Sequence, residues 1–197
     1  FFREGTELFD FENLFYSRRI GKQPSEYTDV MESLGEGDRI IENPSAVKLL
    51  NATKLSGRNR HGLAVGMFNA ITARTEAIVE RADGTQRTIE TEPFTNYNIL
   101  TVDHQFRGNS SFRLINTNVT RSGSARDANV SGAELELSDK QGRFELSGLA
   151  IVTNVREKIL AGVEQDIPEN GKKFMGSLSK SSGHFRFEMI YELMDEH

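Results

Sequence analysis

Residues 94–156 read FTNYNILTVDHQFRGNSSFRLINTNVTRSGSARDANVSGAELELSDKQGRFELSGLAIVTNVR, and this stretch decides the expected fold. It divides into strand-like segments at 94–106, 112–121, 129–138 and 144–155, separated by connections rich in Gly, Ser and Asp. Alternation of apolar and polar residues puts successive side chains on opposite faces of a sheet. The stretch therefore predicts a series of antiparallel strands joined by turns.

The same pattern extends in both directions along the chain, with further strand-like segments at 45–55, 62–74, 172–180 and 185–194. Short connections (SGRNRH, RGNSS, DKQGR, SSGH) alternate with longer ones, including a polar stretch through Asp83-Gly84 and residues 156–171. Tight turns at one end and long loops at the other are typical of outer-membrane barrels. We therefore expect an all-β fold: part of an up-and-down antiparallel transmembrane β-barrel, with about eight strands.

Two segments predict which face each side chain occupies. In 185–194 one face carries Phe185, Phe187, Met189, Tyr191 and Leu193, and the other carries Arg186, Glu188 and Glu192 together with Ile190 and Met194. In 129–138, Ala133, Leu135 and Leu137 alternate with Glu134 and Glu136. We expect the apolar set to face lipid and the charged set to face the barrel interior. Segments 94–106 and 144–155 are apolar on both faces, which predicts burial on both sides, as in a plugged barrel or in a soluble sandwich.

Composition narrows the classes of function. The net charge of −5 lacks the basic excess of a nucleic-acid groove, so no nucleic-acid partner is expected. The chain has no Cys, which excludes disulfides and thiolate metal sites. No apolar run approaches the ~20 residues of a spanning helix. A mean hydropathy of −0.49 suits a barrel or a soluble β-sandwich equally. No cleavable signal is present, so an exported form would begin before Phe1.

Motifs for catalysis, cofactors and metals are absent or incomplete. There is no G-x-S-x-G elbow, and GRNRHG at 57–62 lacks the Lys-Ser/Thr of a phosphate loop. The four histidines are scattered, and the acidic loop at 164–171 matches calcium-ligand spacing only at Glu164 and Asp166. We predict no cofactor, no metal site and no catalytic residue. Four N-x-Ser/Thr triplets, at Asn51, Asn109, Asn118 and Asn129, are interpreted as accidents of polar composition.

Residues 1–44 do not follow the strand pattern and are expected to form an irregular N-terminal segment; residues 45–197 are expected to form the barrel strands. Short helices are expected near Asp29 and at 156–164. The segment is rich in Phe and carries Arg18 and Arg19. It either packs against the sheet as an apolar lead-in or lies in a barrel lumen. In the lumen, Arg18 and Arg19 would pair with inward carboxylates, because a guanidinium suits bidentate pairing. The candidate lumen residues are Arg18, Arg19, Glu134, Glu136, Glu188 and Glu192.

The stretch FFREGTELFDFENLFYSRRIG (1–21) resembles the signature of a family of uncharacterised Gram-negative outer-membrane proteins. Similar pieces follow in order: NATKLSGR (51–58), GLAVGMFNAITARTEA (62–77), EPFTNYNILTVDHQFRG (92–108) and FRFEMIYELMDEH (185–197). In that family a periplasmic domain resembling family-9 carbohydrate-binding modules precedes a C-terminal barrel. The resemblance implies a cell outer-membrane location, lipid as a partner, and carbohydrate binding through a domain before Phe1. Some members carry a membrane-associated hydrolase label.

The function expected from the sequence is a non-enzymatic outer-membrane barrel that passes a ligand or handles surface glycans. Two alternatives stay open: a soluble β-sandwich carbohydrate-binding module and a membrane-associated hydrolase. In that family the barrel region opens with an FF-x-EG motif, which corresponds here to residues 1–5. The chain starts within this motif and ends without the terminal aromatic strand residue of a complete barrel, so it is expected to be a fragment of a larger barrel. Lipid does not tolerate unpaired strand edges. The piece alone is therefore expected to aggregate or to need detergent.

Overall fold

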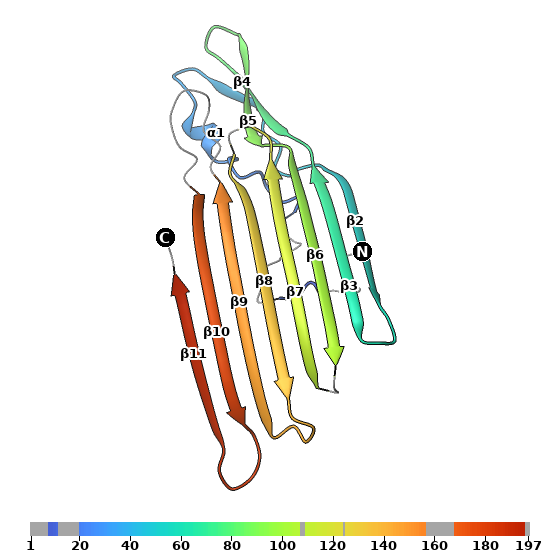
Figure 1. The fold of residues 1–197 in the computed structure, drawn as a ribbon. Helices are drawn as coiled ribbons and strands as arrows, with labels where there is room; N and C mark the ends of the chain where they lie inside the picture. Colours follow the sequence, from blue (N-terminus) through green and yellow to red (C-terminus); the bar gives the residue numbers. More distant parts are fainter. Residues whose placement is uncertain (1–7, 12–19, 107–108, 124, 157–167, 196–197) are drawn as a thin grey trace.

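The computed structural model describes residues 8–11, 20–106, 109–123, 125–156 and 168–195 (Figure 1). This part of the chain contains eleven strands in two antiparallel sheets and one short helix. None of its helices is long and apolar enough to cross a membrane. The all-β, antiparallel class predicted from the sequence is confirmed.

The larger sheet has eight strands in the order β11-β10-β9-β8-β7-β6-β3-β2. Strands that are neighbours in the sheet are also consecutive in the sequence, except β3 and β6, which are separated by β4 and β5 of the smaller sheet. The arrangement is therefore an up-and-down meander, as predicted. The bounds are β2 (Leu49–Arg58), β3 (Leu63–Thr72), β6 (Thr95–Phe106), β7 (Ser110–Arg121), β8 (Asp127–Ser138), β9 (Phe144–Arg156), β10 (Pro168–Lys180) and β11 (Phe187–Asp195). Each strand corresponds to one of the eight segments that the sequence pattern predicted, but β2 begins later than the predicted 45–55, and β10 begins at Pro168, inside the stretch predicted as a long connection. The short turns lie together at one end of the sheet, at the bottom of Figure 1.

The smaller sheet is a feature that the sequence pattern missed. It consists of β1 (Arg39–Glu42), β4 (Thr75–Glu80) and β5 (Gln86–Glu92), in the order β1-β4-β5. The polar stretch through Asp83-Gly84 is therefore the tip of a hairpin, and Gly84 adopts a φ of 82° there. The Thr85 hydroxyl and amide both donate to Asp83 Oδ1, at 2.6 and 2.9 Å, and hold the pKa of that carboxyl below its usual value.

The N-terminal 44 residues contain more than irregular chain, because α1 (Asp29–Glu32) and β1 lie within them. The helix near Asp29 is confirmed. Val30 packs with Ala77 and Val79 in the small core of the second sheet. The other helix, expected at 156–164, lies outside the described residues apart from Arg156, which ends β9. The division of the chain at residue 44 stays a prediction.

The larger sheet is open in the described part of the chain. Its two edges are β2 and β11, which pair only with β3 and β10 (Figure 1). A closed barrel is therefore not confirmed.

The two faces of the larger sheet differ in their contacts. We call the face that contacts Phe9 and Phe11 the inner face and the opposite one the outer face. The inner-face core consists of Phe9, Phe11, Phe68, Ala70, Ile99, Ile115, Leu149 and Ile151. β6 and β9 are apolar on both faces because their inner apolar residues pack in this core. The sequence pattern alone could not separate this arrangement from a sandwich.

Candidate functional site

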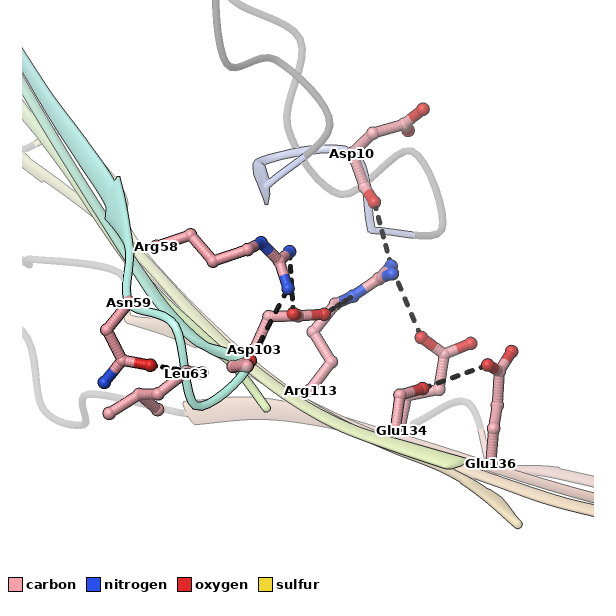
Figure 2. A network of polar contacts seen from close by, with 10 residues as sticks. Asp10, Arg58, Asn59, Leu63, Asp103, Arg113, Glu134 and Glu136 are labelled. Carbon is pink, nitrogen blue, oxygen red and sulfur yellow. Dashed lines mark hydrogen bonds and ion pairs between the residues drawn. The ribbon is translucent and has the colours of Figure 1, made fainter. Parts of the chain in front are cut away.

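A cluster of charged side chains projects from the inner face (Figure 2). It contains Arg58 at the end of β2, Asp103 on β6, Arg113 on β7 and Glu134 on β8. We call these four residues the Asp103 cluster. They come from widely separated parts of the sequence, and strand pairing brings them together.

The register explains why these residues meet. Asp103 is directly opposite Arg113, and Arg113 is directly opposite Glu134, so opposite charges alternate across three strands. Arg58 lies one strand further away, across Ala64 of β3. Because Ala64 is fully buried and presents only a methyl group, the Arg58 side chain can extend over it to Asp103.

Asp103 is the centre of the cluster, since only 6% of its side chain is exposed. Its Oδ1 lies 2.9 Å from Nη2 of Arg58, an ion pair that lacks the alignment of a hydrogen bond. Its Oδ2 lies 3.6 Å from Nε of Arg113. Arg113 Nη1 also lies 3.4 Å from Oε2 of Glu134. A carboxylate this buried is rarely retained without cationic partners, and the two guanidinium groups provide them.

A hollow of about 330 Å³ opens beside the cluster. It is lined by Leu8, Ser56, Gly57, Arg58, Asp103, Gln105 and Arg113. Arg58 is 42% exposed there, so part of its guanidinium faces the hollow. The hollow can therefore accept a polar ligand through charge-assisted hydrogen bonds.

The 8–11 segment covers part of the inner face next to this hollow. Phe9 and Phe11 are 5% and 1% exposed. Lys54 Nζ lies 5.2 Å from the centroid of the Phe9 ring. Arg113 Nη1 donates to the carbonyl oxygen of Asp10 at 3.3 Å, so the cluster also fixes the backbone of the segment. Burial of each of the two Phe side chains stabilises the packing of the 8–11 segment on the inner face by roughly 1.5–3 kcal/mol.

The packing of the 8–11 segment depends on glycines beneath the two Phe rings. A Cβ at Gly132 would lie 2.6 Å from Cε1 of Phe11, and a Cβ at Gly66 would lie 3.0 Å from Cζ of Phe9. Glycine in a strand weakens it but lets another group approach the backbone closely. At Gly132 the approaching group is the Phe11 ring; at Gly66 it is the Phe9 ring together with the Thr101 hydroxyl, whose oxygen would lie 2.8 Å from the Cβ.

Gly132→Ala is therefore expected to lower the free energy of unfolding by about 1–3 kcal/mol, the usual cost of overpacking. The measurement is chemical unfolding followed by the β-sheet circular dichroism signal. Gly148→Ala on β9 is the matched control, because nothing lies within 4 Å of its Cβ position. Equal effects of the two substitutions would contradict the close fit of Phe11 over Gly132.

The structure gives the following positions for the predicted lumen residues. Glu134, Glu136, Glu188 and Glu192 all lie on the inner face by strand register. Glu134 meets Arg113, Glu136 accepts from the Ser111 hydroxyl at 3.0 Å, and Glu192 pairs with Lys173 at 3.0 Å. Glu188 lies opposite Ser179, towards the short-turn end of β11. Arg18 and Arg19 lie outside the described residues.

Sequence reasoning missed Arg58, Asp103 and Arg113. A signal for two of them was present, because the short RGNSS turn joins β6 and β7 and a tight turn fixes the register. Asp103 and Arg113 are equally distant from the paired ends Phe106 and Ser110. Arg58 carried no such signal, because its contact crosses an intervening strand. Among the described residues, no group of three or more His, Asp and Glu side chains is arranged to hold a metal ion.

Comparison with known families gives one match. The family model described as a domain of unknown function (DUF5916) matches residues 1–197. The chain belongs to the DUF5916 family. No curated protein and no solved structure matches the chain. The family assignment covers the Asp103 cluster and both sheets, and it brings no activity with it.

Proposed function

We propose that this chain forms part of the wall of an outer-membrane β-barrel, and that its inner face serves the passage or handling of a polar ligand. The proposal is non-enzymatic. The observation that carries it is a band on the outer face of the larger sheet that has no charged side chain, while the inner face carries charges at the same level.

The outer face carries a continuous apolar band. One directly paired row across the sheet reads Val65, Val102, Leu114, Ala133, Ala150, Phe174 and Leu193. The next row reads Leu63, His104, Phe112, Leu135, Gly148, Gly176 and Tyr191. A third row on the last four strands reads Leu137, Leu146, Leu178 and Met189. The rows are apolar apart from the imidazole of His104 and the hydroxyl of Tyr191, and none of these residues is Asp, Glu, Lys or Arg. We call these three rows the apolar band.

The band is exposed in the described part of the chain. Leu146, Met189, Tyr191 and Leu193 are 48%, 63%, 68% and 50% exposed on this face. Exposed apolar patches of this extent mark interaction with a membrane or another protein. On β9 the apolar outer residues run from Phe144 to Val152, about 27 Å along the strand. Lys180 and Lys172 of β10 lie directly opposite the two ends of this run, on the same face. At a tilt of about 40° this gives a height of about 21 Å, close to the ~25 Å band of an outer-membrane barrel.

At the level of the apolar band, the charged side chains of the same strands lie on the inner face, and the charges of the outer face, such as Lys172, Asp127 and Arg156, lie beyond the band. Arg58, Asp103, Arg113, Glu134, Glu136, Glu188 and Glu192 all lie on the inner face. A polar interior behind an apolar exterior is the arrangement of a barrel wall that lines an aqueous path. A glycan-binding sandwich would need a second sheet packed on one face of the larger sheet. The small sheet does not supply one, because its core is formed by Val30, Ala77 and Val79.

The test is insertion into lipid vesicles by the protein in the form that its gene encodes. Insertion is measured by heat-dependent mobility on gels and by protection from protease. We expect Met189→Arg to abolish insertion, because a charge at mid-bilayer on the lipid face costs ~2–4 kcal/mol. Glu188→Gln, one residue away on the inner face, is expected to insert as the wild type does.

Equal tolerance of the two substitutions would contradict the assignment of the faces. A wild-type protein that stays soluble and monomeric without detergent would overturn the membrane proposal altogether. In that case the soluble carbohydrate-binding module becomes the better explanation.

A further inference from the structure

A row of asparagines crosses the outer face, with one residue on each of six neighbouring strands. Each is directly opposite the next in the strand register, so the row runs perpendicular to the strands. We call it the asparagine row; its members are Asn69, Asn98, Asn118, Asn129, Asn154 and Asn170. With strands ~4.8 Å apart, the row is about 24 Å long.

The asparagine row lies beside the apolar band. On β6, Asn98 is four residues from Val102 of the band, a separation of about 14 Å along the strand. On β9, Val152 lies between Ala150 of the band and Asn154. The row lies at the end of the sheet with the long connections. If the apolar band faces lipid, the row lies at the level of the lipid headgroups.

At each end of the row, the amides of two neighbouring asparagines are hydrogen-bonded to each other. Asn69 Nδ2 donates to Asn98 Oδ1 at 2.8 Å, and Asn154 Nδ2 donates to Asn170 Oδ1 at 2.5 Å. In the centre, Asn118 accepts a bond from the Thr120 hydroxyl at 2.9 Å. The Asn129 amide bonds to Asn116 and not to Asn118: Asn129 Oδ1 accepts from Asn116 Nδ2 at 3.2 Å, and Asn129 Nδ2 donates to Asn116 Oδ1 at 3.4 Å. Among the described residues, the amide NH₂ of Asn118 therefore donates no hydrogen bond and can serve a ligand.

A hollow of about 320 Å³ lies at this central part of the row. It is lined by Asn118, Thr120, Asp127, Ala128, Asn129, Asn154 and Arg156. The lining offers three carboxamides, a hydroxyl, a carboxylate and a guanidinium. Asp127 and Arg156 are directly opposite each other across β8 and β9, so their charges balance. Donors and acceptors set side by side without a charge excess suit neighbouring hydroxyl groups, which also donate and accept.

We propose that this hollow binds the sugar headgroup of a membrane glycolipid whose acyl chains lie on the apolar band. The inference rests on the proposed function, because a lipid-facing outer face is what brings a headgroup to the hollow. A lipid-linked sugar fits this surface better than a free sugar does. The polar hollow and the apolar band are continuous along β9, so a single glycolipid molecule can contact both.

The experiment uses the encoded protein in three kinds of vesicle. The first is phosphatidylcholine alone, the second adds phosphatidylglycerol, and the third adds lipopolysaccharide matched to the second in phosphate charge. The readout is the temperature at which the folded gel band disappears. We expect a higher temperature with lipopolysaccharide than with phosphatidylglycerol, because sugar hydroxyls and not phosphate charge provide the binding. Soluble oligosaccharide cut from the same lipopolysaccharide should give little or no shift.

The variant Asn118→Val with Asn129→Val removes two central amides and keeps strand-forming side chains. It should weaken lipopolysaccharide binding about tenfold and remove most of the shift, the effect of losing a few ligand hydrogen bonds. Insertion into phosphatidylcholine should be unchanged. Asn51→Val, on the same face of edge strand β2, is the matched control and should keep the shift. If the double valine variant does not fold, the serine pair Asn118→Ser and Asn129→Ser replaces it.

The outcomes separate the two claims. Insertion into all three vesicles with equal stability in the second and third would overturn the headgroup site alone. A full shift in the double variant would do the same. A shift with free oligosaccharide as large as that with intact lipopolysaccharide would overturn the lipid as its source. Failure of the wild type to insert into any vesicle would overturn the proposed function and, with it, this inference.

Discussion

Asp103→Ala is expected to lower the free energy of unfolding by about 2–4 kcal/mol, because breaking a buried ion pair leaves its partner charges uncompensated. Asp103 is nearly buried and is contacted by both Arg58 and Arg113. The figure lies below the full range for buried pairs because the two arginine side chains are 42% and 31% exposed, and water screens them in part. Urea unfolding of the detergent-solubilised or vesicle-inserted protein measures the change.

The pair between Glu192 and Lys173 supplies the control. It lies on the same face, but its side chains are 48% and 28% exposed. Glu192→Gln should therefore cost no more than about 1 kcal/mol. A loss for Asp103→Ala that is no larger than this would mean that Asp103 does not organise the cluster. Asp103→Asn should fall between the two, since it keeps the shape and one acceptor but loses the charge.

The main strands could be predicted from the sequence because two signals agreed. Period-two alternation gave the segments, and short turns such as DKQGR gave the neighbours. The face assignment of β8 and β11 followed from the same alternation, and the register confirms that Leu135, Leu137, Met189 and Tyr191 share one face. Their contact with lipid stays a proposal.

The second sheet was missed because its strands are short and polar. β4 alternates Ala77 and Val79 with Glu76 and Glu80, but over six residues that pattern is weak. The Asp83-Gly84 pair between β4 and β5 was a hairpin signal that the sequence reasoning recorded only as a polar stretch.

The candidate site was predicted only in part, and for a physical reason. A strand pattern assigns a side chain to a face but does not say which residue lies opposite it. The glutamates of β8 and β11 could be assigned to the inner face, whereas the Asp103–Arg113 pair needed the register of β6 with β7. The asparagine row needed five registers at once, so Asn118 and Asn129 stood out only as isolated triplets. Arg58 needed the further fact that Ala64 is small.

Phe11→Ala is expected to have the largest effect on the inner face, about 3–5 kcal/mol, the usual cost of deleting a buried aromatic side chain. The Phe11 ring is 1% exposed and lies over Gly132 beside Ile115. Its removal leaves a cavity that the rigid strand below cannot fill. The measurement is the free energy of unfolding in urea, with Phe185→Ala as the control because Phe185 is 68% exposed.

A double-mutant cycle separates the fit of Phe11 from its size. Gly132→Ala destabilises by pushing against Phe11, so its cost should vanish when Phe11 is already alanine. The two effects should then be strongly non-additive, whereas Gly148→Ala should add to Phe11→Ala independently. If Gly132→Ala costs the same in both backgrounds, the glycine serves the strand itself and not the packing of the 8–11 segment. If the 8–11 segment also narrows an aqueous path, Phe11→Ala should raise the ion conductance of the inserted protein in a planar bilayer. An unchanged conductance would show that the segment stabilises the barrel wall without obstructing the path.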